Sequence, residues 1–137
     1  MTKPIRKIVN PEPIHPPLGY SHVVLPLGKQ LAFIAGQVAW DKDFKLVGGD
    51  DLFQQTRQAL INLRSALEAI GAGWENVVKT TIYTTRPTEY ETIGRAMAEI
   101  VGAVAPPASV IAGVSGLAVA EFLIEIEAVV TLDYGAF

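Results

Sequence analysis

Residues 51–70 read DLFQQTRQALINLRSALEAI, and residues 77–85 read VVKTTIYTT. Apolar and small side chains recur through the first stretch at helical spacing, which predicts an amphipathic helix. The stripe consists of Leu52, Phe53, Thr56, Ala59, Leu60, Leu63, Leu67 and Ile70. Gln55 and the charged residues of the stretch fall largely off it. The second stretch is rich in β-branched residues that alternate between two faces, which predicts a strand.

The ends of the first helix are also encoded in the sequence. Asp51 and Gln54 have the spacing of a capping box, in which side chains satisfy the free N–H groups of the first turn. Gly71 and Gly73 follow the last apolar residue, where glycine commonly ends a helix. We therefore expect a helix that begins after Asp51 and ends before Gly71.

A second helix and two further strands are expected downstream. Thr88 and Glu91 again have capping-box spacing. The apolar face of the helix would be formed by Tyr90, Ile93, Met97, Ile100 and Val101. Pro106 and Pro107 prevent its continuation. Residues 109–114 then form a short apolar strand, and residues 122–132 form the longest strand.

The last strand divides its side chains between two faces. One face is apolar and consists of Phe122, Ile124, Ile126, Ala128, Val130 and Leu132. The other carries Glu125 and Glu127 together with Leu123 and Val129. Carboxylates at positions i and i+2 of a strand lie side by side and need partners or water. Two readings remain open: a salt bridge or hydrogen bond from each glutamate to another subunit, or one glutamate that polarises a water molecule.

The N-terminal part is expected to be extended. Five of the nine prolines fall in residues 1–17, which form a proline-rich arm with a partly polyproline path. Residues 23–27 and 31–35 are short apolar segments separated by three residues, a pattern typical of a hairpin. The second of these strands ends at Gly36.

The element order is strand, strand, helix, strand, helix, strand, strand. This order predicts one α+β domain over residues 1–137 with both helices on one face of the sheet. The opposite face stays partly apolar, and a second copy of the chain would cover it. We therefore expect a homo-oligomer.

Composition excludes several kinds of chemistry. The chain has 137 residues, a net charge of −3 and no cysteine, so it has no thiol nucleophile, disulfide or iron–sulfur cluster. Its acidity disfavours nucleic acid as a partner. The prolines near the N-terminus are incompatible with a signal peptide, and Pro106 and Pro107 interrupt the uncharged stretch 100–120, so we expect no membrane segment and a cytoplasmic location.

The residue spacing indicates neither a metal site nor a hydrolase triad. His15 and His22 have no ligand partners at metal-binding spacing. Ser21 and His22 would point to opposite faces of an extended segment, so they do not form a nucleophile and base pair. The segment 113–116 lacks the second glycine of a nucleophile elbow, because residue 117 is leucine.

Six segments of the chain, in order and with matching spacing, resemble the Rid family, also called YjgF-like, from about residue 13 to residue 131. They are LGYSH (18–22), FIAGQ (33–37), QTRQALINL (55–63), VVKTT (77–81), PA (107–108) and IEIEA (124–128). The resemblance implies a chorismate-mutase-like fold with a mixed sheet. It also implies a homotrimer whose sheets form a central β-barrel, with ligand clefts between subunits.

The best-known branch of this family hydrolyses reactive enamines and imines to 2-oxo acids and ammonia without cofactor or metal. By resemblance, Glu125 is the glutamate that holds the attacking water, together with the main-chain carbonyl of Ile111. Tyr20 is the tyrosine of the pocket, and Ala35 and Gly36 occupy the positions of its serine-glycine pair.

The sequence departs from the family pattern at two positions. Ser109 stands where the family has the arginine that clamps the substrate carboxylate, and Gly94 stands where it has an asparagine. A charge-assisted hydrogen bond contributes about 1.5 to 3 kcal/mol, so amino-acid-derived imines should bind more weakly here. Arg95 could substitute for the lost arginine, but the helical stripe places it off the buried face, as a solvated side chain.

Two functions are therefore left open. The first is cofactor-free hydrolysis or deamination of a small enamine-type or imine-type metabolite, with reduced preference for 2-imino acids. The alternative is a non-catalytic protein that binds a small molecule, or serves metabolism as an accessory, on the same trimeric scaffold. The ribonuclease role also attached to the family is disfavoured by the acidic charge.

Overall fold

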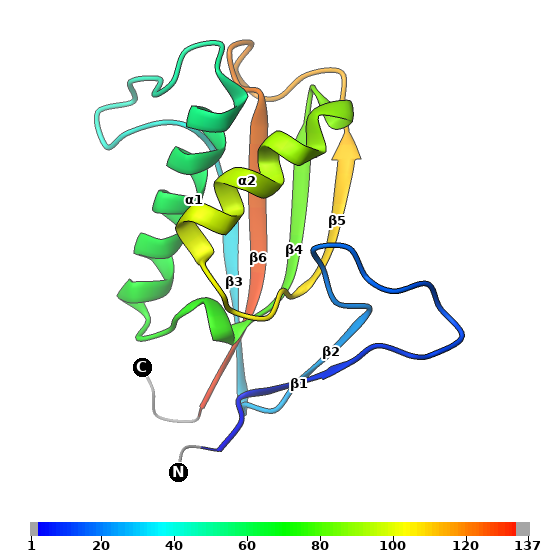
Figure 1. Cartoon of the computed structure of the whole chain (residues 1–137). Helices are drawn as coiled ribbons and strands as arrows, with labels where there is room; N and C mark the ends of the chain where they lie inside the picture. Colours follow the sequence, from blue (N-terminus) through cyan, green and yellow to red (C-terminus); the bar gives the residue numbers. More distant parts are fainter. Residues whose placement is uncertain (1–2, 134–137) are drawn as a thin grey trace.

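The computed structural model describes residues 3–133, so residues 1–2 and 134–137 of the expected domain lie outside the described part. Its main sheet has four strands in the order β3-β6-β4-β5 (Figure 1). They are β3 (Gln30–Gln37), β6 (Ile124–Leu132), β4 (Val77–Thr84) and β5 (Ala108–Gly113). The pairs β3–β6 and β6–β4 are antiparallel, whereas β4 and β5 run parallel. The sheet is therefore mixed.

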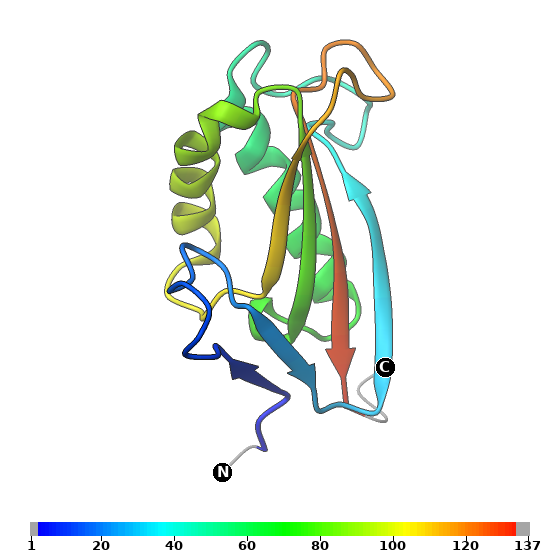
Figure 2. The same ribbon diagram turned by 90° about the vertical axis from the view of Figure 1, so that its right-hand side faces the viewer.

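Both helices, α1 (Leu52–Ala69) and α2 (Tyr90–Val101), pack on the same face of this sheet. Figure 2 shows the sheet edge-on, with the helices on one side and the other side bare. The α+β class and the one-sided helix layer predicted from the sequence are confirmed. In the described residues neither helix combines the length and apolar character needed to cross a membrane.

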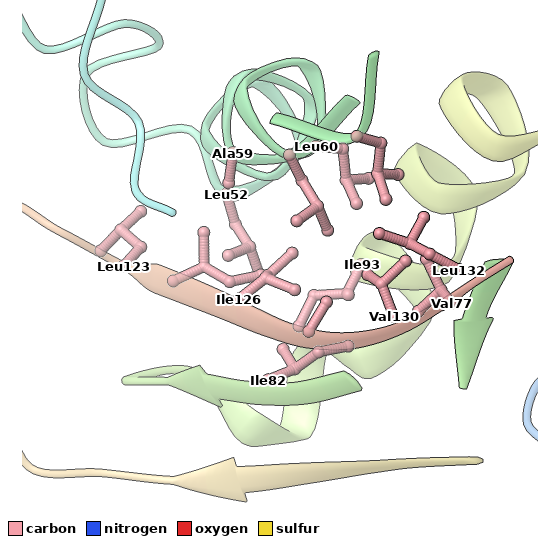
Figure 3. Close-up of a cluster of buried hydrophobic side chains, with 14 residues drawn as sticks. Leu52, Ala59, Leu60, Val77, Ile82, Ile93, Leu123, Ile126, Val130 and Leu132 are labelled. Atoms are coloured by element: carbon pink, nitrogen blue, oxygen red, sulfur yellow. The ribbon is translucent and has the colours of Figure 1, made fainter. Parts of the chain in front are cut away.

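The hydrophobic core fills the space between the helices and the sheet (Figure 3). Leu60, Leu63 and Leu67 of α1 are almost completely buried against Ile126 and Val130 of β6. These residues alternate on the strand and recur every third or fourth position on the helix, as the two periodicities require. The core thereby fixes which face of β6 points away from the helices.

Helix α1 begins as expected, but the prediction that Gln55 lies off its buried stripe is wrong. The Asp51 carboxylate accepts a hydrogen bond from the Gln54 backbone N–H at 3.1 Å. Gln55, expected off the buried stripe, is 0% exposed. Its side chain donates to the carbonyls of Gly49 and Glu121, at 2.7 and 2.9 Å, and accepts from the Leu123 N–H at 2.9 Å. Burial is tolerated because the amide is fully hydrogen-bonded.

The start of α2 differs from the prediction. A 3-10 turn, η2 (Pro87–Glu89), precedes the helix, and its N-cap Glu89 makes no side-chain capping bond. The expected Thr88–Glu91 box does not form because Thr88 lies inside the 3-10 turn and Glu89 is the N-cap of α2. Of the expected apolar face, Ile93 is buried and Met97 and Ile100 are partly buried against the core, whereas Tyr90 is 57% exposed. A second 3-10 turn, η1 (Trp74–Asn76), leads into β4.

The predicted hairpin between residues 23–27 and 31–35 is wrong, although both strands exist. β2 (Val23–Pro26) pairs instead with β1 (Arg6–Val9), which lies within the proline-rich arm. The chain turns at Gly28, whose N–H donates to Thr131 Oγ1 at 3.0 Å. A Cβ at Gly28 would lie 2.3 Å from the Leu132 carbonyl oxygen, so only glycine allows this close approach. The turn directs β3 along β6 and away from β2.

The last strand begins at Ile124, two residues later than expected. Leu123 was placed beside the glutamates on the open face, but it is only 8% exposed and belongs to the core. It precedes the regular strand, so strand alternation does not govern its direction, and its N–H is held by Gln55. Val129 stays on the open face, paired with Phe33 of β3.

Candidate functional site

A cavity of about 690 Å³ opens between α2, the edge strand β5 and the segment 18–20. We call it the helix-side cleft. Its lining is largely apolar and consists of Leu18, Gly19, Tyr20, Ile82, Pro87, Tyr90, Glu91, Ile93, Gly94, Met97, Ser109, Val110 and Ile111. Four of the residues singled out from the sequence, namely Tyr20, Gly94, Ser109 and Ile111, meet here.

Local backbone contacts bring these residues together. Ser21 is bridged to Ala108 at the start of β5, and its N–H donates to the Pro107 carbonyl at 2.9 Å. This contact fixes Tyr20 at the cleft. Ser109 pairs with Thr80 and Ile111 pairs with Ile82 in the parallel ladder, so both side chains share the helix-covered face of the sheet.

The position of the expected arginine is filled by a neutral hydroxyl pair. The Thr80 hydroxyl donates to Ser109 Oγ at 2.7 Å. Glu91 is the one charged residue in the cleft lining, and it is acidic. The cleft therefore offers no cationic side chain to a bound carboxylate from the described part of this chain.

Arg95 does not replace the missing arginine. Its guanidinium carbon lies 5.6 Å from the centroid of the Phe53 ring, and Nη2 donates to Thr92 Oγ1 at 3.3 Å. Both partners lie outside the cleft lining. The expectation that Arg95 is a surface arginine is confirmed.

Glu125, Ala35 and Gly36 form a second group, on the open face of the sheet. A Cβ at Gly36 would lie only 2.0 Å from Glu125 Oε2, so the carboxylate lies directly against the Gly36 backbone. Ala35 precedes this glycine on β3, where the β3–β6 register shifts between Ile34 and Gln37. The absence of a side chain at Gly36 thus makes room for Glu125.

The two glutamates of β6 have different surroundings. Glu127 accepts a hydrogen bond from the Tyr83 hydroxyl at 2.9 Å. This bond, together with partial burial and the negative charges of Glu127 and Glu125, raises the pKa of Tyr83. Within residues 3–133 no side chain donates a hydrogen bond or forms an ion pair with Glu125. Glu125 is the carboxylate that stays available to a water molecule or a neighbouring subunit.

One protomer does not unite the two groups. In the β4–β6 ladder the backbone of Glu125 lies opposite that of Tyr83, and both side chains are on the open face. Ser109 and Ile111 face the helices on the other side of the sheet. The sheet lies between the two groups. The described residues also contain no cluster of three or more histidine, cysteine, aspartate or glutamate side chains that could hold a metal.

Sequence reasoning missed two features of the helix-side cleft. Glu91 was interpreted only as a capping residue, although it lines the cleft. His15 was given no role, yet its Nε2 lies 2.6 Å from the Tyr20 hydroxyl oxygen. No periodicity could indicate this contact, because it depends on how the irregular segment 10–22 folds back on itself.

The element order and the one-sided helix layer define a single-domain α+β protein of the YjgF-like class. The family model described as Endoribonuclease L-PSP matches residues 9–132. Rid family protein YyfB of Yersinia pestis, a protein of unknown function, superimposes with a TM-score of 0.88 at 39% identity, covering 93% of this chain and 99% of that one. The chain therefore belongs to the Rid family, also called YjgF-like.

Two curated relatives extend the comparison. RutC family protein PH0854 of Pyrococcus horikoshii is 35% identical over 126 residues, which cover 91% of this chain and 97% of that protein. A 2-iminobutanoate/2-iminopropanoate deaminase of Rattus norvegicus is 29% identical over 94 residues, which cover 68% of this chain and 67% of that protein.

Proposed function

We propose that this protein is a cofactor-free hydrolase of small imines or enamines, with Glu125 as the residue that activates water. The observation that carries the proposal is the contrast between the two glutamates. Glu127 is occupied by Tyr83, whereas Glu125 lies against Gly36 without a side-chain partner in the described chain. The glutamate with free lone pairs is the one that the family resemblance assigns to the water.

We further propose that the active site forms between subunits of a homotrimer with a central β-barrel. The open face of the sheet supports this, because Phe33 is 76% exposed there and Leu31 is 48% exposed. Such side chains favour burial against another copy of the chain. A neighbouring subunit would supply Glu125 and Gly36 to a helix-side cleft that contains Tyr20, Ser109 and the Ile111 carbonyl.

The proposed reaction adds one water molecule to a C=N bond. Glu125 accepts a proton from water as the water oxygen bonds to the imine carbon. That proton is passed to the nitrogen, which gives a carbinolamine. Glu125 then takes the proton of the new hydroxyl and gives it to the nitrogen as the C=O bond forms and the C–N bond breaks, so the products are a carbonyl compound and ammonia. A carboxylate positioned in this way can act first as general base and then as general acid.

The lining of the helix-side cleft favours substrates without a carboxylate. Ser109 and Thr80 present neutral hydroxyls, and Glu91 repels anions. A second hollow of about 250 Å³ shares Gly19, Gly94 and Met97 with the cleft and reaches the buried side chains of Leu60 and Leu63. This surface suits an uncharged metabolite with an apolar group.

The test is the rate of ammonia release from imines generated in the assay. An amine oxidase acting on benzylamine supplies an imine without a carboxylate. We expect wild-type protein to accelerate its hydrolysis and Glu125→Gln to abolish the acceleration. Glu127→Gln is the matched control and should keep most of it. Equal activity of Glu125→Gln and wild type would contradict the role of Glu125.

The alternative function is binding without turnover, and the serine at position 109 is the observation that favours it. A ligand that raises the melting temperature but is recovered chemically unaltered would support a binding protein. In that case the benzylamine-derived imine would decay at the same rate with and without the protein.

A further inference from the structure

Hydrogen bonds within the segment 10–22 fold it back on itself, and one of them reaches Tyr20 at the helix-side cleft. The His22 backbone N–H donates to Asn10 Oδ1 at 2.8 Å. The Nε2 of His22 lies 2.7 Å from the His15 carbonyl oxygen, and the Nε2 of His15 lies 2.6 Å from the Tyr20 hydroxyl. The two imidazole rings are 4.9 Å apart in an edge-to-face arrangement. Tyr20 therefore meets the cleft with its hydroxyl already held by a histidine.

The chemistry of these contacts assigns the donors. A carbonyl oxygen only accepts, so His22 carries its hydrogen on Nε2. The tyrosine phenol ordinarily keeps its proton up to about pH 10, so the direction of the His15–Tyr20 bond depends on His15. With a neutral imidazole that carries its hydrogen on Nδ1, Tyr20 donates to Nε2 and its oxygen is an acceptor toward the cleft. With an imidazolium, Nε2 donates to Tyr20, and the phenolic hydrogen is free for a ligand.

We propose that His15 is a positioning residue that sets whether Tyr20 donates or accepts a hydrogen bond in the helix-side cleft. The proposal rests on the proposed function in one respect, namely that Tyr20 faces a ligand there. Histidine is the side chain whose ordinary change of charge falls between pH 5 and 8. Protonation of the Nδ1–H tautomer of His15 would therefore reverse the polarity of the Tyr20 hydroxyl.

Several titratable groups lie near enough to His15 to influence its charge. Tyr20 and His22 are the titratable side chains whose rings lie close to His15 in residues 3–133. Glu12 is an exposed carboxylate of the same segment, and Tyr90 and Glu91 are the titratable residues with which α2 lines the cleft. The His22 ring is the closer of the two to His15, with centroids 4.9 Å apart against 6.4 Å for Tyr20.

The test is carbon-13 NMR of the free protein labelled at tyrosine Cζ, a carbon whose resonance responds to the hydrogen bonding of the hydroxyl. We expect the Tyr20 resonance to shift in step with the protonation of the His15 imidazole as the pH is varied. Tyr90 lines the same cleft without a histidine partner among the described residues, so its resonance should stay constant in the same sample. This comparison needs no variant beyond Tyr20→Phe for assignment.

Two variants separate His15 from its neighbour. His15→Phe keeps a ring in the segment and should abolish the Tyr20 response, whereas His22→Phe should preserve it. A Tyr20 resonance that stays constant from pH 5 to 8, or a response that survives in His15→Phe, would overturn the proposal. Because no substrate is added, this result is independent of whether the cleft is catalytic.

Discussion

Gln55 is predicted to be the polar residue on which the positioning of β6 most depends. Its amide joins α1 to the backbone of Gly49, in the loop before the helix, and to the backbone of Glu121 and Leu123. Glu121 and Leu123 come just before β6, the strand that carries Glu125. Gln55→Leu keeps the approximate volume but removes all three hydrogen bonds. Gly49 and Glu121 are exposed residues, whose carbonyls can turn to water, whereas Leu123 is buried, so its N–H stays unpaired.

The expected cost follows from these differences. An unpaired buried N–H costs about 1 to 3 kcal/mol, and each lost hydrogen bond contributes about 1 kcal/mol. We therefore expect Gln55→Leu to lower the free energy of unfolding by about 3 kcal/mol, a large part of the 5 to 15 kcal/mol typical of a domain. Urea denaturation followed by circular dichroism measures this change.

Gln54→Leu is the matched control, because Gln54 is the exposed neighbour on the same helix. Exposed substitutions usually change stability by less than about 0.5 kcal/mol. Equal free energies of unfolding for the two variants would mean that the buried Gln55 amide does not stabilise the segment before β6, which would refute this reasoning.

Three further perturbations test other parts of the structure. Asp51→Ala removes the acceptor that caps α1 and should lower the free energy of unfolding by about 1 kcal/mol; unchanged urea denaturation would argue against the cap. The Glu127 hydrogen bond raises the pKa of Tyr83 above its ordinary 10.0, so its stabilisation is complete below about pH 10 and is lost as the pH rises through the raised value. The difference in unfolding free energy between wild type and Tyr83→Phe should accordingly shrink above pH 10, and a constant difference up to pH 12 would contradict the assignment. Phe33→Lys places a charge on the open face, where Phe33 is 76% exposed, and should convert the proposed trimer to monomers in light scattering; an unchanged mass would place the subunit interface elsewhere.

The two helices and the strands of the main sheet were predictable because each has a periodic apolar pattern, whereas β1 in the proline-rich arm was not predicted. Leu60, Leu63 and Leu67 repeat at helical spacing and form the core, and Ile126 and Val130 alternate on β6 as a strand requires. The hairpin was wrong because short apolar strands do not specify their partner. Contact of Gly28 with the end of β6 decided the pairing instead, and no local pattern indicates a contact between residues about a hundred positions apart.

The candidate site was only partly predictable for a related reason. The family resemblance indicated Tyr20, Gly94, Ser109 and Ile111, and these residues line one cleft. Glu91 and His15 lie in or beside the same cleft, but no motif in the sequence indicates a role for either residue there. Glu91 lies on an exposed face of α2, and His15 lies in an irregular segment. Composition and spacing do not determine where either side chain points.

The most direct test of the proposed specificity is ammonia release from 2-imino acids by wild type and by Ser109→Arg. The substrates are generated in the assay by an amino-acid oxidase. Two charge-assisted hydrogen bonds from arginine to the substrate carboxylate, at about 1.5 to 3 kcal/mol each, predict a gain in kcat/KM of at least about 100-fold. Little activity in wild type and this gain in Ser109→Arg would agree with an intact water site that has lost its carboxylate grip. High wild-type activity on 2-imino acids, with no gain in Ser109→Arg, would contradict it.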